Sequence, residues 1–134
     1  MTVFTSSIVF ETRGEFDVVD LTRQVEEVVR DSGVREGITV IYAGHATGII
    51  ILNEYDHALL EDLKDFMTML LPSHNDYNHP GNAFSHLRSM LFTPSRVIPV
   101  HDGRLGLGTW QSLYWVEAER RPRRRRVEIT VIGE

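Results

Sequence analysis

The sequence predicts a single compact α+β domain, in which mostly antiparallel β-sheets pack against two or three helices. Three observations predict it: strand-like segments gather at both ends of the chain, helical periodicity is confined to the middle, and short turns join neighbouring strands. A chain of 134 residues, 42% of them hydrophobic, suffices for one core and is too short for two independent ones. We therefore expect residues 1–134 to form one domain.

The first part of the chain alternates strand and helix patterns. Residues 5–11 alternate loosely, as a strand does, and apolar residues recur on one helical face after Leu21. Asp17 or Asp20 can cap that helix, and Gly33 stands where a helix C-terminus favours glycine. Two β-branched strands are expected next, the second more buried than the first, at residues 37–42 and 47–52.

The clearest helix covers residues 57–71 and ends at Pro72. Its apolar stripe consists of Leu59, Leu60, Leu63, Phe66, Met67 and Leu70. A polar loop then leads to Asn82, which can cap a short third helix. Strand patterns return after Pro94, at residues 96–100, 109–117 and 127–131.

Composition excludes several classes of protein. The chain has no cysteine, so disulfides, cysteine-ligated zinc sites and thiol nucleophiles are ruled out. No apolar run approaches the ~20 residues of a membrane helix, and the start of the chain lacks a signal-peptide pattern. We therefore expect a cytoplasmic protein that does not engage a membrane.

The net charge of −5 conceals a block of six arginines within residues 120–126. Such a block can contact nucleic acid or an acidic surface. The alternative is an exposed turn, and it is favoured because the rest of the chain is acidic and has no second basic patch. We expect no nucleic-acid partner.

Three of the six histidines lie at the boundaries of predicted elements, namely His45, His79 and His86. Imidazoles and carboxylates that converge from different segments can hold a divalent metal, zinc or magnesium, with Glu54 and Asp102 as candidate oxygen ligands. No HExxH motif supports this, and hydrogen-bonded polar histidines are the alternative. His57 and His74 are expected to be exposed.

Other candidate groups follow the ends of predicted strands. Asn53 and Glu54 come directly after a buried strand, where they mark either the mouth of a site or a solvated strand end. Asp102-Gly103 is a strong hairpin signal, and Arg104 beside it can grip a phosphate with its planar fork. The competing interpretation pairs Arg104 with Glu54 or Asp102 and gives it a purely structural role. No nucleotide-binding glycine loop and no GxSxG nucleophile motif occurs.

Several of these segments together resemble the YjbQ family, also called UPF0047. The shared segments in the first part of the chain are Gly44-His45-Ala46-Thr47, Asn53-Glu54, Asp62, Leu71-Pro72, Tyr77-Asn78-His79 and Asn82-Ala83-Phe84-Ser85-His86-Leu87. Those near its end are the run from Ile98 to Gln111, which contains Asp-Gly-Arg-Leu and Leu-Gly-Thr-Trp-Gln, and Arg126-Val127-Glu128-Ile129. Two departures are Ala46, where the family pattern has a small hydroxyl residue, and Phe84, where it has proline or histidine.

The resemblance implies a homotrimeric α+β protein with thiamine phosphate synthase activity, which is a secondary activity of the family. That reaction joins a pyrimidine diphosphate to a thiazole phosphate and releases pyrophosphate. We assign catalysis to Glu54 and Asp102, and metal binding to the three histidines. Substrate and phosphate contacts are assigned to Thr47, Asn53, Arg104, Trp110 and Gln111. The alternatives are a metal-dependent hydrolase and a non-enzymatic ligand-binding module that use the same pocket.

Overall fold

The computed structural model describes all residues from Met1 to Glu134 and confirms the α+β class. The helices are α1 (Thr22–Ser32), α2 (His57–Leu70) and α3 (Ala83–Met90). The strands are β1 (Thr2–Thr12), β2 (Val18–Asp20), β3 (Gly37–Ala43), β4 (Gly48–Asn53), β5 (Ser95–His101), β6 (Arg104–Leu105), β7 (Ser112–Glu117) and β8 (Arg123–Gly133). No helix has both the length and the apolar character that crossing a membrane requires.

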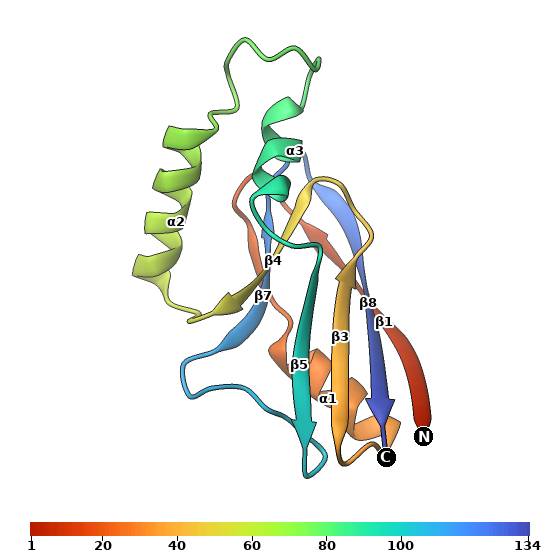
Figure 1. The fold of residues 1–134 in the computed structure, drawn as a ribbon. Helices are drawn as coiled ribbons and strands as arrows, with labels where there is room; N and C mark the ends of the chain where they lie inside the picture. Colours follow the sequence, from red (N-terminus) through yellow and green to blue (C-terminus); the bar gives the residue numbers. More distant parts are fainter.

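The strands form two antiparallel sheets of unequal size (Figure 1). The large sheet has the order β1-β8-β3-β5-β6, and the small sheet has the order β2-β7-β4. Strands that are distant in the sequence are neighbours here, since the first and last long strands pair along their whole length, from Thr2 opposite Gly133 to Thr12 opposite Arg123. Both chain termini therefore lie at the same end of the large sheet.

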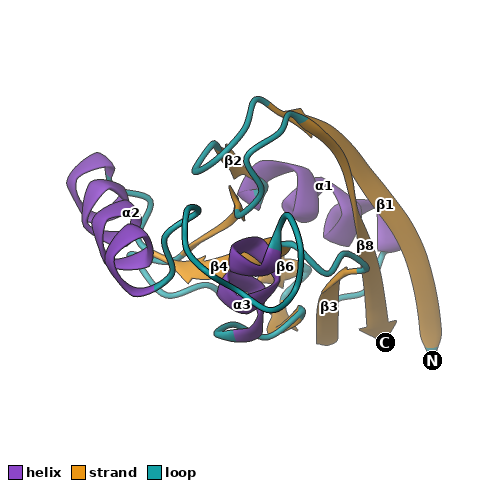
Figure 2. Ribbon diagram, turned by 90° about the horizontal axis from the view of Figure 1, so that it is seen from above, coloured by secondary structure: helices purple, strands orange, loops and turns teal.

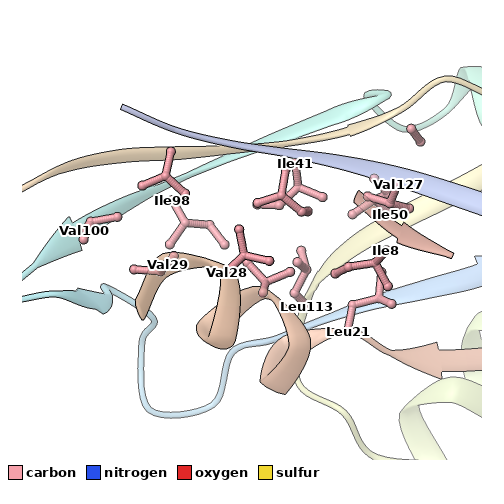
Figure 3. Close-up of a cluster of buried hydrophobic side chains, with 14 of the residues drawn as sticks. Ile8, Leu21, Val28, Val29, Ile41, Ile50, Ile98, Val100, Leu113 and Val127 are labelled. Atoms are coloured by element: carbon pink, nitrogen blue, oxygen red, sulfur yellow. The ribbon is translucent and has the colours of Figure 1, made fainter. Parts of the chain in front are cut away.

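The main core lies between the large sheet, α1 and one face of the small sheet. Figure 3 shows Val28 and Val29 of α1 beneath Ile41 and Ile98 of the large sheet, with Leu113 of β7 beside them. The expected cap by Asp17 or Asp20 is not formed, because α1 begins at Thr22 with Leu21 in the N-cap position and has no side-chain capping bond. Asp20 Oδ1 instead accepts a hydrogen bond from Thr22 N, and the helix ends at Gly33, where φ is 73°.

A second, smaller core covers the other face of the small sheet. Ile49 and Ile51 of β4 pack there with Met67 of α2, whereas Ile50 between them faces the main core. Both faces of β4 are therefore buried, which explains its continuous apolar run. Figure 2, a view from above, shows α2 at one side of the domain and α1 beside β1 and β8, on the inner side of the large sheet.

Several details of the sequence-based prediction were wrong. The strand expected at 109–117 begins only at Ser112, and the last strand begins at Arg123, so that it takes in arginines expected in a turn. Asn82 precedes α3 as predicted, but its side chain makes no capping bond because it donates to Glu119. In addition, half of the apolar stripe of α2 is exposed.

Gly48 is required by close packing against the indole ring of Trp115, which is completely buried. A Cβ at this position would overlap that ring. We predict that Gly48→Ala lowers the free energy of unfolding by about 1–3 kcal/mol or more, the typical cost of overpacking a core. Urea unfolding of the purified protein measures this loss. Gly44→Ala is the matched control, because its Cβ would meet Tyr42 at an ordinary 3.6 Å, and an equal loss there would contradict the prediction.

Candidate functional site

The predicted site residues lie in several separate regions of the chain. His45 belongs to the connection between β3 and β4, whereas Asn53 is the last residue of β4 and Glu54 follows it. Arg104 is at the hairpin between β5 and β6, at the opposite end of the large sheet from the beginning of β8 (Figure 1). One chain therefore does not assemble all of these residues into one pocket.

His45 is partly buried and is held by the start of β8. Its Nε2 lies 3.1 Å from both the backbone nitrogen and the carbonyl oxygen of Arg126, and its ring meets Trp115 edge to face. Burial, followed by the charge of nearby Arg125, lowers the pKa of His45. Because the backbone of Arg126 occupies Nε2, Nδ1 is the ring nitrogen left for a ligand.

Thr47 has a structural role that its sequence position does not reveal. Arg125 Nη2 donates to both the carbonyl oxygen (3.1 Å) and the hydroxyl (3.2 Å) of Thr47. The same guanidinium forms a buried two-pronged ion pair with Glu117, of which the Nε–Oε1 bond is 2.8 Å long. The substrate role expected for Thr47 has no support from this geometry, since its hydroxyl is buried and occupied.

His79 and His86 come together as predicted, but His45 does not join them. The two rings lie 5.0 Å apart between centroids, beside a cavity of about 510 Å³ that Tyr77 and Met90 also line. His45 instead lines a separate cavity with Tyr42 and other residues of the large sheet. No group of three or more His, Asp or Glu side chains in the chain is arranged to hold a metal. The expected three-histidine site is therefore not formed within one chain.

Asn53 and Glu54 lie at an exposed strand end. Asn53 Oδ1 accepts a hydrogen bond from the backbone nitrogen of Glu54, and the carbonyl of Glu54 accepts one from the Tyr114 hydroxyl at 3.1 Å. Burial, and then the neighbouring charge of Glu54, raises the pKa of Tyr114. The Glu54 carboxylate itself forms no ion pair, so it is free to act on a group brought to it.

The hairpin at Asp102-Gly103 has the predicted geometry. Both residues have positive φ, 52° and 77°, as a tight two-residue hairpin turn requires. Glu36 braces the turn, because its carboxylate accepts from the backbone nitrogen of Asp102 at 3.0 Å and contacts His101 Nδ1 at 3.1 Å. These contacts fix the backbone from which the side chain of Arg104 extends.

Arg104 lines a cavity of about 640 Å³ and has no acidic partner within 4.0 Å. The structural alternative, an ion pair with Glu54 or Asp102, is not formed, because Asp102 faces Arg35 at 3.8 Å. Arg30 and Arg35 line the same cavity, together with Glu26 and Asp102. Sequence reasoning missed these two arginines because they come from α1 and the segment after it, and no motif joins them to Arg104.

Trp110 and Gln111 lie outside the lining of the Arg104 cavity. Trp110 is 73% exposed, which leaves its ring available for stacking. Gln111 closes its own loop, since its Oε1 accepts from Gly108 N at 2.8 Å. His57 and His74 are both exposed, as predicted from the sequence.

The two-sheet α+β fold occurs in a known class of proteins. The profile of the family described as UPF0047 protein YjbQ-like matches residues 6–134. A UPF0047 protein of Methanothermobacter thermautotrophicus is 35% identical over 137 residues, covering 100% of this chain and 95% of the relative. The UPF0047 protein YugU of Bacillus subtilis is 32% identical, covering 87% of this chain and 90% of the relative.

Solved structures of related proteins have the same fold over nearly the whole chain. A YbjQ-like protein of unknown function from Sulfolobus solfataricus superposes with a TM-score of 0.94 at 32% identity, covering 98% of each chain. A hypothetical protein from Aeropyrum pernix gives a TM-score of 0.91 at 36% identity, covering 97% of this chain and 98% of its own. The chain belongs to the YjbQ-like UPF0047 family.

The lowered pKa of His45 predicts a loss of stability in mild acid. Below the unfolded value of about 6.5, the unfolded chain takes up a proton at His45 more readily than the folded chain does, so stability falls as the pH drops. We expect the difference in unfolding free energy between pH 7.5 and pH 5.5 to be smaller in His45→Gln than in the unmodified protein. Urea titrations at the two pH values measure it. His74→Gln, which changes an exposed histidine, should keep the original difference, and an unchanged difference in His45→Gln would refute the prediction.

Proposed function

We propose that the Arg104 cavity binds the phosphate of a small phosphorylated substrate and that the reaction is of the thiamine phosphate synthase type. The observation that carries the proposal is that Arg104 extends from a braced turn into a cavity and has no acidic partner. A guanidinium in this position can form two parallel hydrogen bonds to phosphate oxygens. Arg30 lines the same cavity, whereas Arg35 in that lining lies 3.8 Å from Asp102.

For this reaction the protein has to position the two substrates and to stabilise the charges that develop on them. The carbon–oxygen bond of the pyrimidine diphosphate breaks, pyrophosphate leaves with the electron pair, and the thiazole nitrogen bonds to the carbon. Arginine side chains neutralise the phosphate groups, and a carboxylate or an aromatic face stabilises the developing cation. Glu54 and Trp110 are the groups we assign to that second task, and both are exposed.

A complete site of this kind requires a second copy of the chain, because Glu54 and Trp110 lie outside the lining of the Arg104 cavity. We propose that the chain forms a homotrimer; the number three rests on the family resemblance. The outer face of the large sheet supports assembly. It exposes a row of apolar side chains, namely Val3, Ile38, Tyr42 and Val97. Phe66, Met69 and Leu70 of α2 are exposed as well, and apolar surfaces of this kind commonly mark interfaces.

A metal-dependent hydrolase is the second candidate, and the His79–His86 pair is the observation that favours it. Two imidazoles are one ligand fewer than a catalytic zinc site requires. One chain does not supply the third ligand. The metal content of the purified protein separates the candidates, since tightly bound zinc favours hydrolysis and loosely held magnesium favours diphosphate chemistry.

We predict that Arg104→Lys weakens the binding of a thiazole phosphate by roughly 1–3 kcal/mol, the scale of a charge-assisted hydrogen bond. Lysine keeps the charge but cannot form the two-pronged contact. Calorimetric titration of the purified protein measures the change. Thermal stability should stay within about 0.5 kcal/mol, because Arg104 is exposed and unpaired.

Arg23→Lys is the matched control for this experiment. Arg23 is an exposed arginine on α1 outside the cavity, and its replacement should leave affinity unchanged. If Arg104→Lys lowers the melting temperature but leaves the affinity for the thiazole phosphate unchanged, the phosphate-anchor hypothesis is refuted.

We predict that the protein has a mass about three times the 15.4 kDa of one chain in light scattering at micromolar concentration. Val97 is 56% exposed and pairs with Val40 on β3, in the middle of the proposed interface. Val97→Glu should therefore dissociate the assembly into single folded chains, because a buried unpaired carboxylate is costly. Gln24→Glu adds the same charge to the exposed side of α1 and should leave the trimer intact. A monomeric unmodified protein would overturn the proposal.

A further inference from the structure

The fold gives the arginines of the block different surroundings. Arg120 and Arg121 lie in the connection between β7 and β8, before the strand begins. Side chains alternate along β8, so that Arg125 is buried on the inner face whereas Arg124 and Arg126 are exposed on the other. The block is therefore not one uniform basic surface.

Arg120, Arg121 and Arg123 line a single cavity of about 640 Å³. Gly81 and Asn82, which precede α3, and Phe84 within it line the same cavity. The volume falls within the range of small-molecule sites. Residues from two distant parts of the sequence thus enclose a space large enough for a small phosphorylated molecule.

The cavity carries an excess of positive charge. Neither Arg120 nor Arg121 has an acidic side chain within 4.0 Å, whereas Arg123 lies 3.5 Å from Glu119. Glu119 is the only acidic residue of the lining, and it is buried. Its Oε2 already accepts hydrogen bonds from Asn82 (2.9 Å) and Ser85 (3.3 Å). Three guanidinium groups therefore face one compensated carboxylate, which leaves two positive charges without partners.

We propose that this cavity binds the phosphate or diphosphate group of a small molecule, through Arg120 and Arg121. Planar guanidinium groups match phosphate oxygens in geometry as well as in charge. Arg123, held by Glu119, contributes charge to the wall of the site. The proposal goes beyond the proposed synthase function, because Arg104 lies at the other end of the large sheet and lines a different cavity.

The test uses the full chain carrying Arg104→Gln, which removes the other proposed phosphate anchor. Inorganic pyrophosphate and inorganic phosphate are titrated into it by calorimetry. We expect saturable binding, tighter for pyrophosphate because it can engage two guanidinium groups. Adding Arg120→Gln and Arg121→Gln should weaken the binding of pyrophosphate at least tenfold. Both residues are exposed, so the variant should keep its melting temperature.

The matched control adds Arg124→Gln instead, which removes the same charge from the same block but outside the cavity. It should change the affinity for pyrophosphate less than twofold. Absence of saturable binding to the Arg104→Gln protein would overturn the proposal, as would an unchanged affinity after both cavity arginines are replaced. A single-stranded oligonucleotide is the final probe. The block is a nucleic-acid surface, and the small-anion site is refuted, if two results are found together. The oligonucleotide binds more tightly than pyrophosphate, and Arg124→Gln weakens oligonucleotide binding as much as the replacement of Arg120 and Arg121 does.

Discussion

The buried ion pair between Glu117 and Arg125 holds the two sheets of this protein together. Glu117 ends β7 of the small sheet, and Arg125 comes from β8 of the large sheet. Thr12 of β1 donates to the same carboxylate at 2.7 Å, and the guanidinium reaches Thr47 before β4. Burying two charges is costly unless hydrogen bonds compensate them, and this network supplies partners for both carboxylate oxygens of Glu117 and for Nε and Nη2 of Arg125. Loss of either charge would leave the other buried and unpaired, at a cost of about 3–5 kcal/mol.

Neither residue of this pair lines either of the two arginine-lined cavities. The pair fixes the end of the large sheet where β8 begins, close in sequence to the arginines that line one cavity. At the opposite end, a different device positions Arg104, namely the Asp102-Gly103 turn braced by Glu36. Near each cavity, a buried or charge-assisted contact thus fixes the backbone that carries arginines of the lining. Exposed apolar strips on the large sheet and on α2 lie outside both cavities and are available for assembly.

Local signals predicted most of the elements, because they depend on residues close together in the chain. The one-sided pattern before Gly33 predicted α1, and Pro72 correctly marked the end of α2. Asp102-Gly103 predicted its hairpin because only a few residue types tolerate positive φ. The pairing of β1 with β8 was beyond such reasoning, since it joins residues more than 100 positions apart.

The sequence by itself determined the fold class, the family, the Arg104 turn and the identity of the histidines available for a site. Only the tertiary structure decided which of these groups meet. It brought His79 to His86 but tied His45 to the backbone of Arg126, and it buried Arg125 while leaving Arg124 beside it exposed. The physical reason is that strand alternation and long-range pairing set the surroundings of each side chain, and no local pattern of residue types encodes that register.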